Sequence, residues 1–261
     1  MADVEPSIEI DRRLEREDPT SRVPVIIDQA MILDLDGPVI ILGDPGLGKS
    51  VLAQAIGRQA GFVYVRAASF VRNAQPERLI SNGECLVIDG LDEIASATVG
   101  GGVDAILGQL SKLGYPRFIL SSREVDWRGA ADRIKIEDDY GQPAILLHLL
   151  AFDHDDATLF LRRNFPSVDA EGLLTHLADR GLEEIYKNPL TLRLIGEVAA
   201  SDEALPDSRA QLLDRACQLL VQEDNPPPSG RRARACRGRE TPSRRRCLCR
   251  SPIAMRPCGA V

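Results

Sequence analysis

Residues 39–50 read VIILGDPGLGKS. The first four are apolar and three of them are β-branched, which is typical of a buried strand. They run directly into the pattern G-x-x-x-x-G-K-S at 43–50, and VLAQAIGRQAG follows with apolar residues at helical spacing. This pattern between a strand and a helix predicts a loop that binds nucleotide phosphates. The predicted binding residues are Gly43, Asp44, Pro45, Gly46, Leu47, Gly48, Lys49, Ser50 and Val51.

Each residue type in the loop suits this task. The glycines let the main chain approach the phosphates closely, and backbone N–H groups with the N-terminus of the next helix attract the anion. Lys49 is expected to reach the β- and γ-phosphates, and the Ser50 hydroxyl to coordinate Mg²⁺. The alternative is a glycine-rich turn that matches by chance, and the strand before it and the helix after it argue against that.

A second motif, CLVIDGLDE, occupies residues 85–93. Asp89 ends an apolar strand and is the predicted Mg²⁺ ligand beside the loop. Glu93, or else Asp92, is the predicted base that activates the attacking water. The alternative interpretation is an acidic turn whose carboxylates cap a helix.

Polar residues also end the apolar run FIL at 118–120, on the side where ligands bind in such sheets. Among them, Arg123 is predicted to contact the γ-phosphate. Its alternative interpretation is a surface salt bridge, which is the usual setting of arginine.

The order of elements predicts an α/β fold. Further strands are expected at 62–65, 86–89, 118–120 and 145–147, alternating with helices, one of which carries Val103, Ile106, Leu107, Leu110 and Leu113 on one face. After 150 the pattern is helical, with caps expected at Asp153 and Asp156, at Asn188-Pro189, and at Ser208 with Gln211. We divide the chain into a polar N-terminal segment (1–22, with a short strand or helix at 8–14), a nucleotide-binding domain (23–150), a helical subdomain (151–225) and a tail (226–261).

Composition limits the other classes of function. No apolar run approaches the roughly 20 residues of a membrane span, and the acidic N-terminus lacks the apolar core of a secretory signal. We therefore expect a cytoplasmic protein with no membrane partner. The three histidines, His148, His154 and His176, lack the spacing of metal ligands, Cys85 has the apolar surroundings of a buried thiol, and Trp127 is expected in a core or interface.

The tail differs from the rest of the chain. Residues 230–261 contain ten arginines, one acidic residue and no lysine, and four of the six cysteines lie there. Many like charges and few large apolar residues predict disorder. We favour out-of-frame translation of a GC-rich gene; a basic arm for nucleic acid or membrane surfaces and a zinc site are the alternatives, although the cysteine spacing does not suit zinc.

Four segments together resemble one family: LGDPGLGKS, CLVIDGLDE, FILSSRE and NPLTLRLIGEVA closely resemble the NACHT-type P-loop NTPases of the STAND class. In that class a small residue follows the Mg²⁺-binding Asp and an acidic pair comes two positions later, as in Asp89, Gly90, Asp92 and Glu93. The resemblance covers 23–224. It implies a parallel sheet of order 2-3-4-1-5 flanked by helices, with a small all-helical subdomain after it.

The resemblance also implies ATP with Mg²⁺, a slow signalling or defence switch, Arg123 as the sensor, and Pro189 near the adenine. We expect nucleotide as the ligand, nucleotide-dependent self-association or a partner protein, and no nucleic acid. The chain departs from the family because nothing after 225 resembles its winged helix, and only about 22 polar residues precede Val23. Two alternatives stay open, an AAA+-like motor or loader and a nucleotide-binding remnant without turnover.

Overall fold

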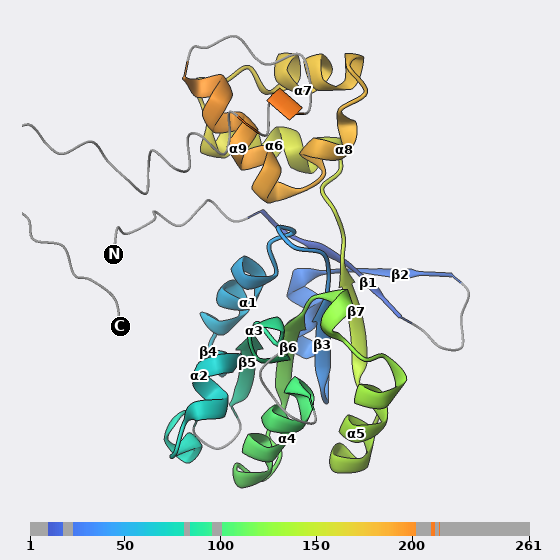
Figure 1. Ribbon diagram of the computed structural model, residues 1–261, viewed down its shortest axis with the longest axis vertical. Helices are drawn as coiled ribbons and strands as arrows, with labels where there is room; N and C mark the ends of the chain where they lie inside the picture. Colours follow the sequence, from blue (N-terminus) through green and yellow to red (C-terminus); the bar gives the residue numbers. More distant parts are fainter. Residues whose placement is uncertain are drawn as a thin grey trace, which may run out of the picture.

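A seven-stranded sheet lies beneath a group of helices in the computed structural model (Figure 1), which describes residues 10–17, 23–80, 84–95 and 101–201 with 210, 211 and 214. Across the sheet the strands stand in the order β2-β1-β7-β3-β6-β5-β4. Their bounds are β1 (Arg13–Arg16), β2 (Val25–Asp28), β3 (Val39–Leu42), β4 (Phe62–Arg66), β5 (Cys85–Asp89), β6 (Phe118–Ser122) and β7 (Ile145–Leu149).

Five of these strands, β4, β5, β6, β3 and β7, are parallel neighbours. Counted along the chain, they stand in the order 2-3-4-1-5 across the sheet. The strand β3 lies in the middle and is buried along its whole length. The mixed α/β class expected from the alternating pattern is therefore present.

The N-terminal strands differ from the sequence analysis, which set residues 1–22 apart as a polar segment. The strand β1 pairs antiparallel with β7 on one side and with β2 on the other, so the described part of that segment extends the sheet. Ile10, Arg12 and Leu14 alternate with more exposed neighbours and are buried. The short strand or helix expected at 8–14 is thus a strand that lies further along, at Arg13–Arg16, and the alternation around it is hard to assign from sequence because it is short and includes an arginine on its buried face.

Helices cover both faces of the sheet (Figure 1). The helices before 150 are α1 (Lys49–Gly57), α2 (Ala67–Arg72), α3 (Asp92–Ala95), α4 (Gly102–Lys112) and α5 (Ala130–Tyr140), with 3-10 turns η1 (Gln29–Asp34), η2 (Pro76–Arg78) and η3 (Glu124–Asp126). Alternate residues of β3 face opposite sides, since Ile40 packs in the cluster with α2, α4 and α5, whereas Ile41 packs in the cluster with α1.

The predicted apolar face of α4 is confirmed. Val103, Ile106, Leu107 and Leu110 are buried against the sheet, and Leu113 packs on the same cluster. Trp127 also packs there, half-buried, as a core residue.

After the sheet, four helices form a region with an apolar core of its own. They are α6 (His154–Asn164), α7 (Ala170–Asp179), α8 (Glu183–Tyr186) and α9 (Pro189–Ala200). The predicted caps are confirmed: Asp153 and Asp156 form a capping box, and Asn188 caps α9 with Pro189 in its first turn. No helix of the described ranges combines the length and apolar character that crossing a membrane requires.

Two predictions fall on residues that the structure does not describe. The capping pair of Ser208 with Gln211 includes one such residue, and the tail at 226–261 lies wholly outside the described ranges. The domain boundaries stay predictions.

The place of β1 in the sheet can be tested at Leu14, whose side chain is fully buried. Leu14→Ala should lower the free energy of unfolding by about 2–4 kcal/mol, because it leaves a cavity in the core. Urea unfolding measures this, with Arg16→Ala as the matched control, since Arg16 lies exposed on the same strand. Equal effects of the two substitutions would mean that β1 does not belong to the sheet.

Candidate functional site

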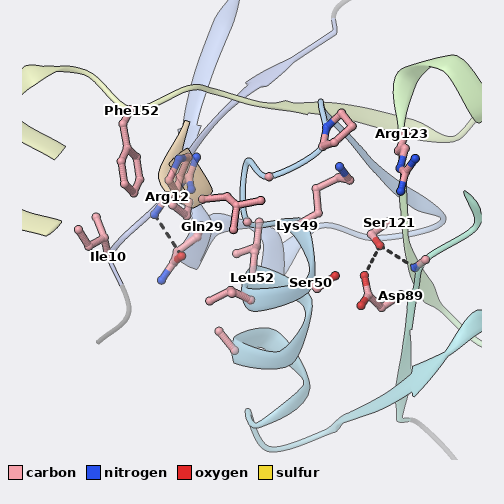
Figure 2. Close-up of a pocket in the computed structure, with 18 of the residues that line it drawn as sticks. Ile10, Arg12, Gln29, Lys49, Ser50, Leu52, Asp89, Ser121, Arg123 and Phe152 are labelled. Carbon is pink, nitrogen blue, oxygen red and sulfur yellow. Dashed lines mark hydrogen bonds between the residues drawn. The ribbon is translucent and has the colours of Figure 1, made fainter. Parts of the chain in front are cut away.

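A cavity of about 580 Å³ opens at the carboxyl ends of the parallel strands, between the sheet and the four-helix region. Figure 2 shows the loop after β3, the end of β5 and the segment around Arg12 on its walls. Most of the predicted site residues meet here. Those that line the cavity are Pro45, Gly46, Gly48, Lys49, Ser50, Val51, Asp89, Asp92, Glu93, Arg123 and Pro189.

Three predicted binding residues do not line the cavity: Gly43, Asp44 and Leu47. The Leu47 side chain is buried in the core between the sheet and α1, because the loop must also seal that core. Gly43 and Asp44 contribute to the structure of the loop through their carbonyl oxygens, which accept hydrogen bonds from Lys49.

The loop between β3 and α1 needs glycine at two positions. Gly46 has a φ of 83° and Gly48 a φ of 94°, in the left-handed region that side chains disfavour. Gly48 is also the N-cap of α1, and no side chain caps that helix. The first backbone N–H groups of α1 are therefore available to an anion at the cavity wall.

Lys49 holds the loop in its present shape. Its Nζ donates to the carbonyl oxygens of Gly43 at 2.7 Å and Asp44 at 2.9 Å. Burial lowers the pKa of Lys49 below its ordinary value, and the nearby Asp92 opposes that shift. An anion in the cavity offers this ammonium group a stronger partner than neutral carbonyls do.

Asp89 is buried at the end of β5, and both of its carboxylate oxygens accept hydrogen bonds. Ser121 Oγ donates to Oδ1 at 2.5 Å, and the Tyr64 hydroxyl donates to Oδ2 at 3.1 Å. Ser121 Oγ in turn accepts from the Gly90 N–H at 3.0 Å. These contacts fix the direction of the carboxylate.

The oxygen groups of Ser50 and Asp89 fit Mg²⁺, which takes one or two protein oxygens and keeps most of its water. Figure 2 shows Ser50 on the side of α1 that faces Asp89. Within the described residues no cluster of three or more His, Cys, Asp or Glu side chains that could hold a metal ion is present.

Arg123 forms an ion pair with Asp92, with Nε and Oδ2 2.8 Å apart. The alternative interpretation of Arg123, a salt bridge, therefore describes this structure. The pair nevertheless lies at the candidate site, because both residues line the cavity. Glu93 has no ion pair or side-chain hydrogen bond among the described residues. Of the two candidate bases, Glu93 is the one whose carboxylate is unengaged.

The other end of the cavity is more apolar and includes residues that the sequence analysis missed. Ile10, Arg12, Gln29 and Phe152 lie together there (Figure 2). Leu190, beside the loop, also lines the cavity. These five residues come from four separate segments, and no local pattern marks them. Tyr64 was missed for the same reason, because in the sequence it reads as one more residue of an apolar strand.

The remaining candidates carry structural roles. His148 lies 3.1 Å from a Glu124 carboxylate oxygen, and His154 lies 3.3 Å from Glu171. Burial raises the pKa of the Cys85 thiol to about 11, which keeps it protonated and unreactive at neutral pH.

No described protein family and no curated protein matches this sequence. Among solved structures, the chain is similar to the RuvB Holliday junction branch migration motor of Thermotoga maritima, at 16% identity and a TM-score of 0.40 over 73% of this chain and 67% of that one. It is also similar to AMPPCP-bound DnaA from Aquifex aeolicus, at 17% identity and a TM-score of 0.43 over 75% of this chain and 66% of that one. The chain thus spans about two thirds of each.

The strained loop predicts opposite effects of two glycine substitutions. Gly46→Ala should lower the free energy of unfolding by about 1–3 kcal/mol, because φ is 83° and the new Cβ would stand 2.6 Å from Asn188 Oδ1. Gly108→Ala, in the exposed face of α4 with open space around it, should raise that free energy by about 0.5–1 kcal/mol. Denaturant unfolding compares them, and a stabilising Gly46→Ala would contradict the loop geometry.

Proposed function

We propose that this chain binds ATP with Mg²⁺ in the cavity and hydrolyses it slowly. The observation that carries the proposal is the meeting of Lys49, Ser50 and Asp89 at the uncapped N-terminus of α1, on the wall of one cavity. Cation, hydroxyl, carboxylate and free backbone N–H groups are together the set that a nucleotide triphosphate with its metal requires.

In the proposed complex the β-phosphate lies on the backbone N–H groups of the loop. Lys49 exchanges the carbonyl oxygens of Gly43 and Asp44 for phosphate oxygens. Ser50 and Asp89 hold Mg²⁺, which neutralises charge on the phosphates. Ser121 and Tyr64 keep the Asp89 carboxylate in place.

Glu93 accepts the proton of the attacking water in this proposal. The water oxygen bonds to the γ-phosphorus, the bond from that phosphorus to the bridging oxygen breaks, and ADP and phosphate result. Asp92 is the second candidate, but Arg123 neutralises it in the present structure. In this proposal Arg123 breaks its ion pair with Asp92 and contacts the γ-phosphate instead. ADP lacks that phosphate, so the exchange would occur only with ATP.

The apolar part of the cavity lining, which includes Phe152, Leu190 and Pro189, is the proposed place of the base. Apolar and aromatic surfaces suit the flat face of a purine. The choice of ATP over GTP rests on the resemblance of the sequence motifs to the NACHT-type NTPases.

The class of NTPase is proposed from the same motifs. We place the chain with the NACHT-type switches of the STAND class, in the cytoplasm, where nucleotide state controls self-association or a partner protein. An AAA+-like motor or loader would use the same site equally well, and a remnant would bind without turnover. Measurable ATP hydrolysis would exclude the remnant without turnover. A stable ring of several copies of this chain, formed in the presence of ATP, would favour the motor or loader.

Binding is tested at Lys49. Lys49→Ala should weaken ATP affinity by at least about 100-fold while leaving the unfolding midpoint near that of the parent, because it removes the loop's only cationic side chain. A titration with ATP and Mg²⁺ measures this. Lys112→Ala, on α4 away from the cavity, is the control. Unchanged affinity in Lys49→Ala would remove Lys49 from the site.

Hydrolysis is tested at Glu93. Glu93→Gln keeps the shape of the side chain but not its basicity, so ATP should still bind while steady-state turnover falls by about 10²–10⁴-fold. Glu137→Gln, on the exposed face of α5, should hydrolyse ATP at the parental rate. If Glu93→Gln also keeps the parental rate, the base has been assigned wrongly and Asp92 is examined next.

A further inference from the structure

Three consecutive carbonyl oxygens of the phosphate-binding loop are held by donors from outside the loop. Two donors belong to the start of α9 and one to the segment before β1, so they reach the loop from both ends of the described chain. The three hydrogen bonds are Asn188 Nδ2 to Pro45 O at 2.9 Å, the Leu190 N–H to Gly46 O at 3.3 Å, and Arg12 Nη1 to Leu47 O at 2.7 Å.

These bonds fix the direction of the loop's N–H groups. A trans peptide is planar and holds its C=O and the following N–H on opposite sides. A donor on the Pro45 carbonyl therefore sets the N–H of Gly46, and a donor on the Leu47 carbonyl sets the N–H of Gly48. Gly46 and Gly48 line the cavity, so two of the three braced peptides present their N–H groups where the proposed phosphate lies. The third brace, on the Gly46 carbonyl, sets the N–H of Leu47, which donates to the Asp44 carbonyl within the loop.

Asn188 serves two elements with one amide group. Its Oδ1 accepts from the N–H groups of Leu190 at 3.0 Å and Thr191 at 3.4 Å, which caps α9. Its Nδ2 donates to the loop. The contact is close, because a Cβ at Gly46 would stand 2.6 Å from Asn188 Oδ1. The start of α9 therefore packs directly on the loop.

Arg12 braces the loop from the other side. It is only 8% exposed, its Nη2 donates to the Leu150 carbonyl at 2.5 Å, and its Cζ lies 4.6 Å from the centre of the Phe152 ring. Burial lowers its pKa to about 10. Arg12 has no carboxylate in ion-pair contact within the described ranges, whereas the next residue, Arg13, has two.

We propose that Arg12 and Asn188 are positioning residues for the phosphate-binding amides, so that affinity for the β-phosphate depends on the segment before β1 and the start of α9 both being seated on the loop. This inference rests on the proposed function. It adds that two segments outside the loop set how tightly the loop holds phosphate, by acting on the loop's carbonyl oxygens and not on the phosphate.

The test compares ADP with AMP, since only ADP has a β-phosphate. Asn188→Ser keeps a good N-cap oxygen but is too short to donate to Pro45 O. The ratio of ADP to AMP affinity, measured by competition against a fluorescent ADP analogue, should fall by about 3- to 10-fold, as expected for one hydrogen bond. The matched control is Asp169→Ser, which makes the same kind of cap exchange on α7, away from the cavity.

Arg12 is tested by the same ratio. Arg12→Met keeps an apolar stem of similar length and should lower the ratio by about 10- to 100-fold, since the lost donor is charged. Arg12→Lys restores one charged donor and should recover part of the loss. Arg13→Met is the control, because Arg13 contacts the four-helix region through Asp153 and Asp156 but not the loop.

The outcomes separate the two proposals. A parent chain that binds neither nucleotide would overturn the proposed function. A parent chain that binds ADP, with Asn188→Ser and Arg12→Met leaving the ADP to AMP ratio unchanged, would overturn the positioning role alone. Equal losses for ADP and AMP, or a lowered ratio in the control variants, would show a general effect on folding and would also overturn it.

Discussion

A loop that turns its backbone N–H groups toward a cavity must turn its carbonyl oxygens elsewhere, and those oxygens need donors of their own. In the loop at 43–50 the first carbonyls are held by Lys49 and the later ones by Arg12 and the start of α9. Glycine at 46 and 48 permits the required backbone angles. The shape of the loop is thus a property of three distant parts of the chain, although its sequence is contiguous.

The same reasoning applies to the acidic wall of the cavity. Because β5 and β6 are parallel neighbours with Ile88 opposite Leu120, the next residues, Asp89 and Ser121, come together at the carboxyl edge. Tyr64 reaches Asp89 from β4 on the other side. The register of the strands, which is set by apolar packing on both faces of the sheet, therefore fixes the orientation of the Asp89 carboxylate.

Sequence reasoning succeeded where the signal is local. The apolar strands, the face of α4 and the caps at Asp153 and Asn188 each follow from residues within one or two turns of one another, and the structure has them. The glycine-rich loop and the acidic turn after β5 were recognised in the same way, and they line one cavity. The roles assigned to those residues stay predictions.

Sequence reasoning failed where a residue's role depends on contacts with residues far away in the chain. Arg12 is a charged residue on the buried face of a short segment, and its partner Leu150 is 138 positions away. A guanidinium is tolerated there because backbone carbonyls and an aromatic ring replace water around it, and nothing in the local pattern reveals those groups. The short strand or helix expected at 8–14 left the pairing of β1 unpredicted for the same reason, since that pairing with β7 depends on residues far along the chain.

The N-terminal segment takes part in two cores at once. Ile10 packs among the four helices while Leu14 packs against the sheet, and the chain crosses the same gap again between Leu149 and Phe152. The four-helix region is therefore attached to the sheet by two backbone segments that are far apart in the sequence, and not by a single linker. The Leu150 N–H donates to the Arg13 carbonyl, so the two segments are also bonded to each other where they leave the sheet.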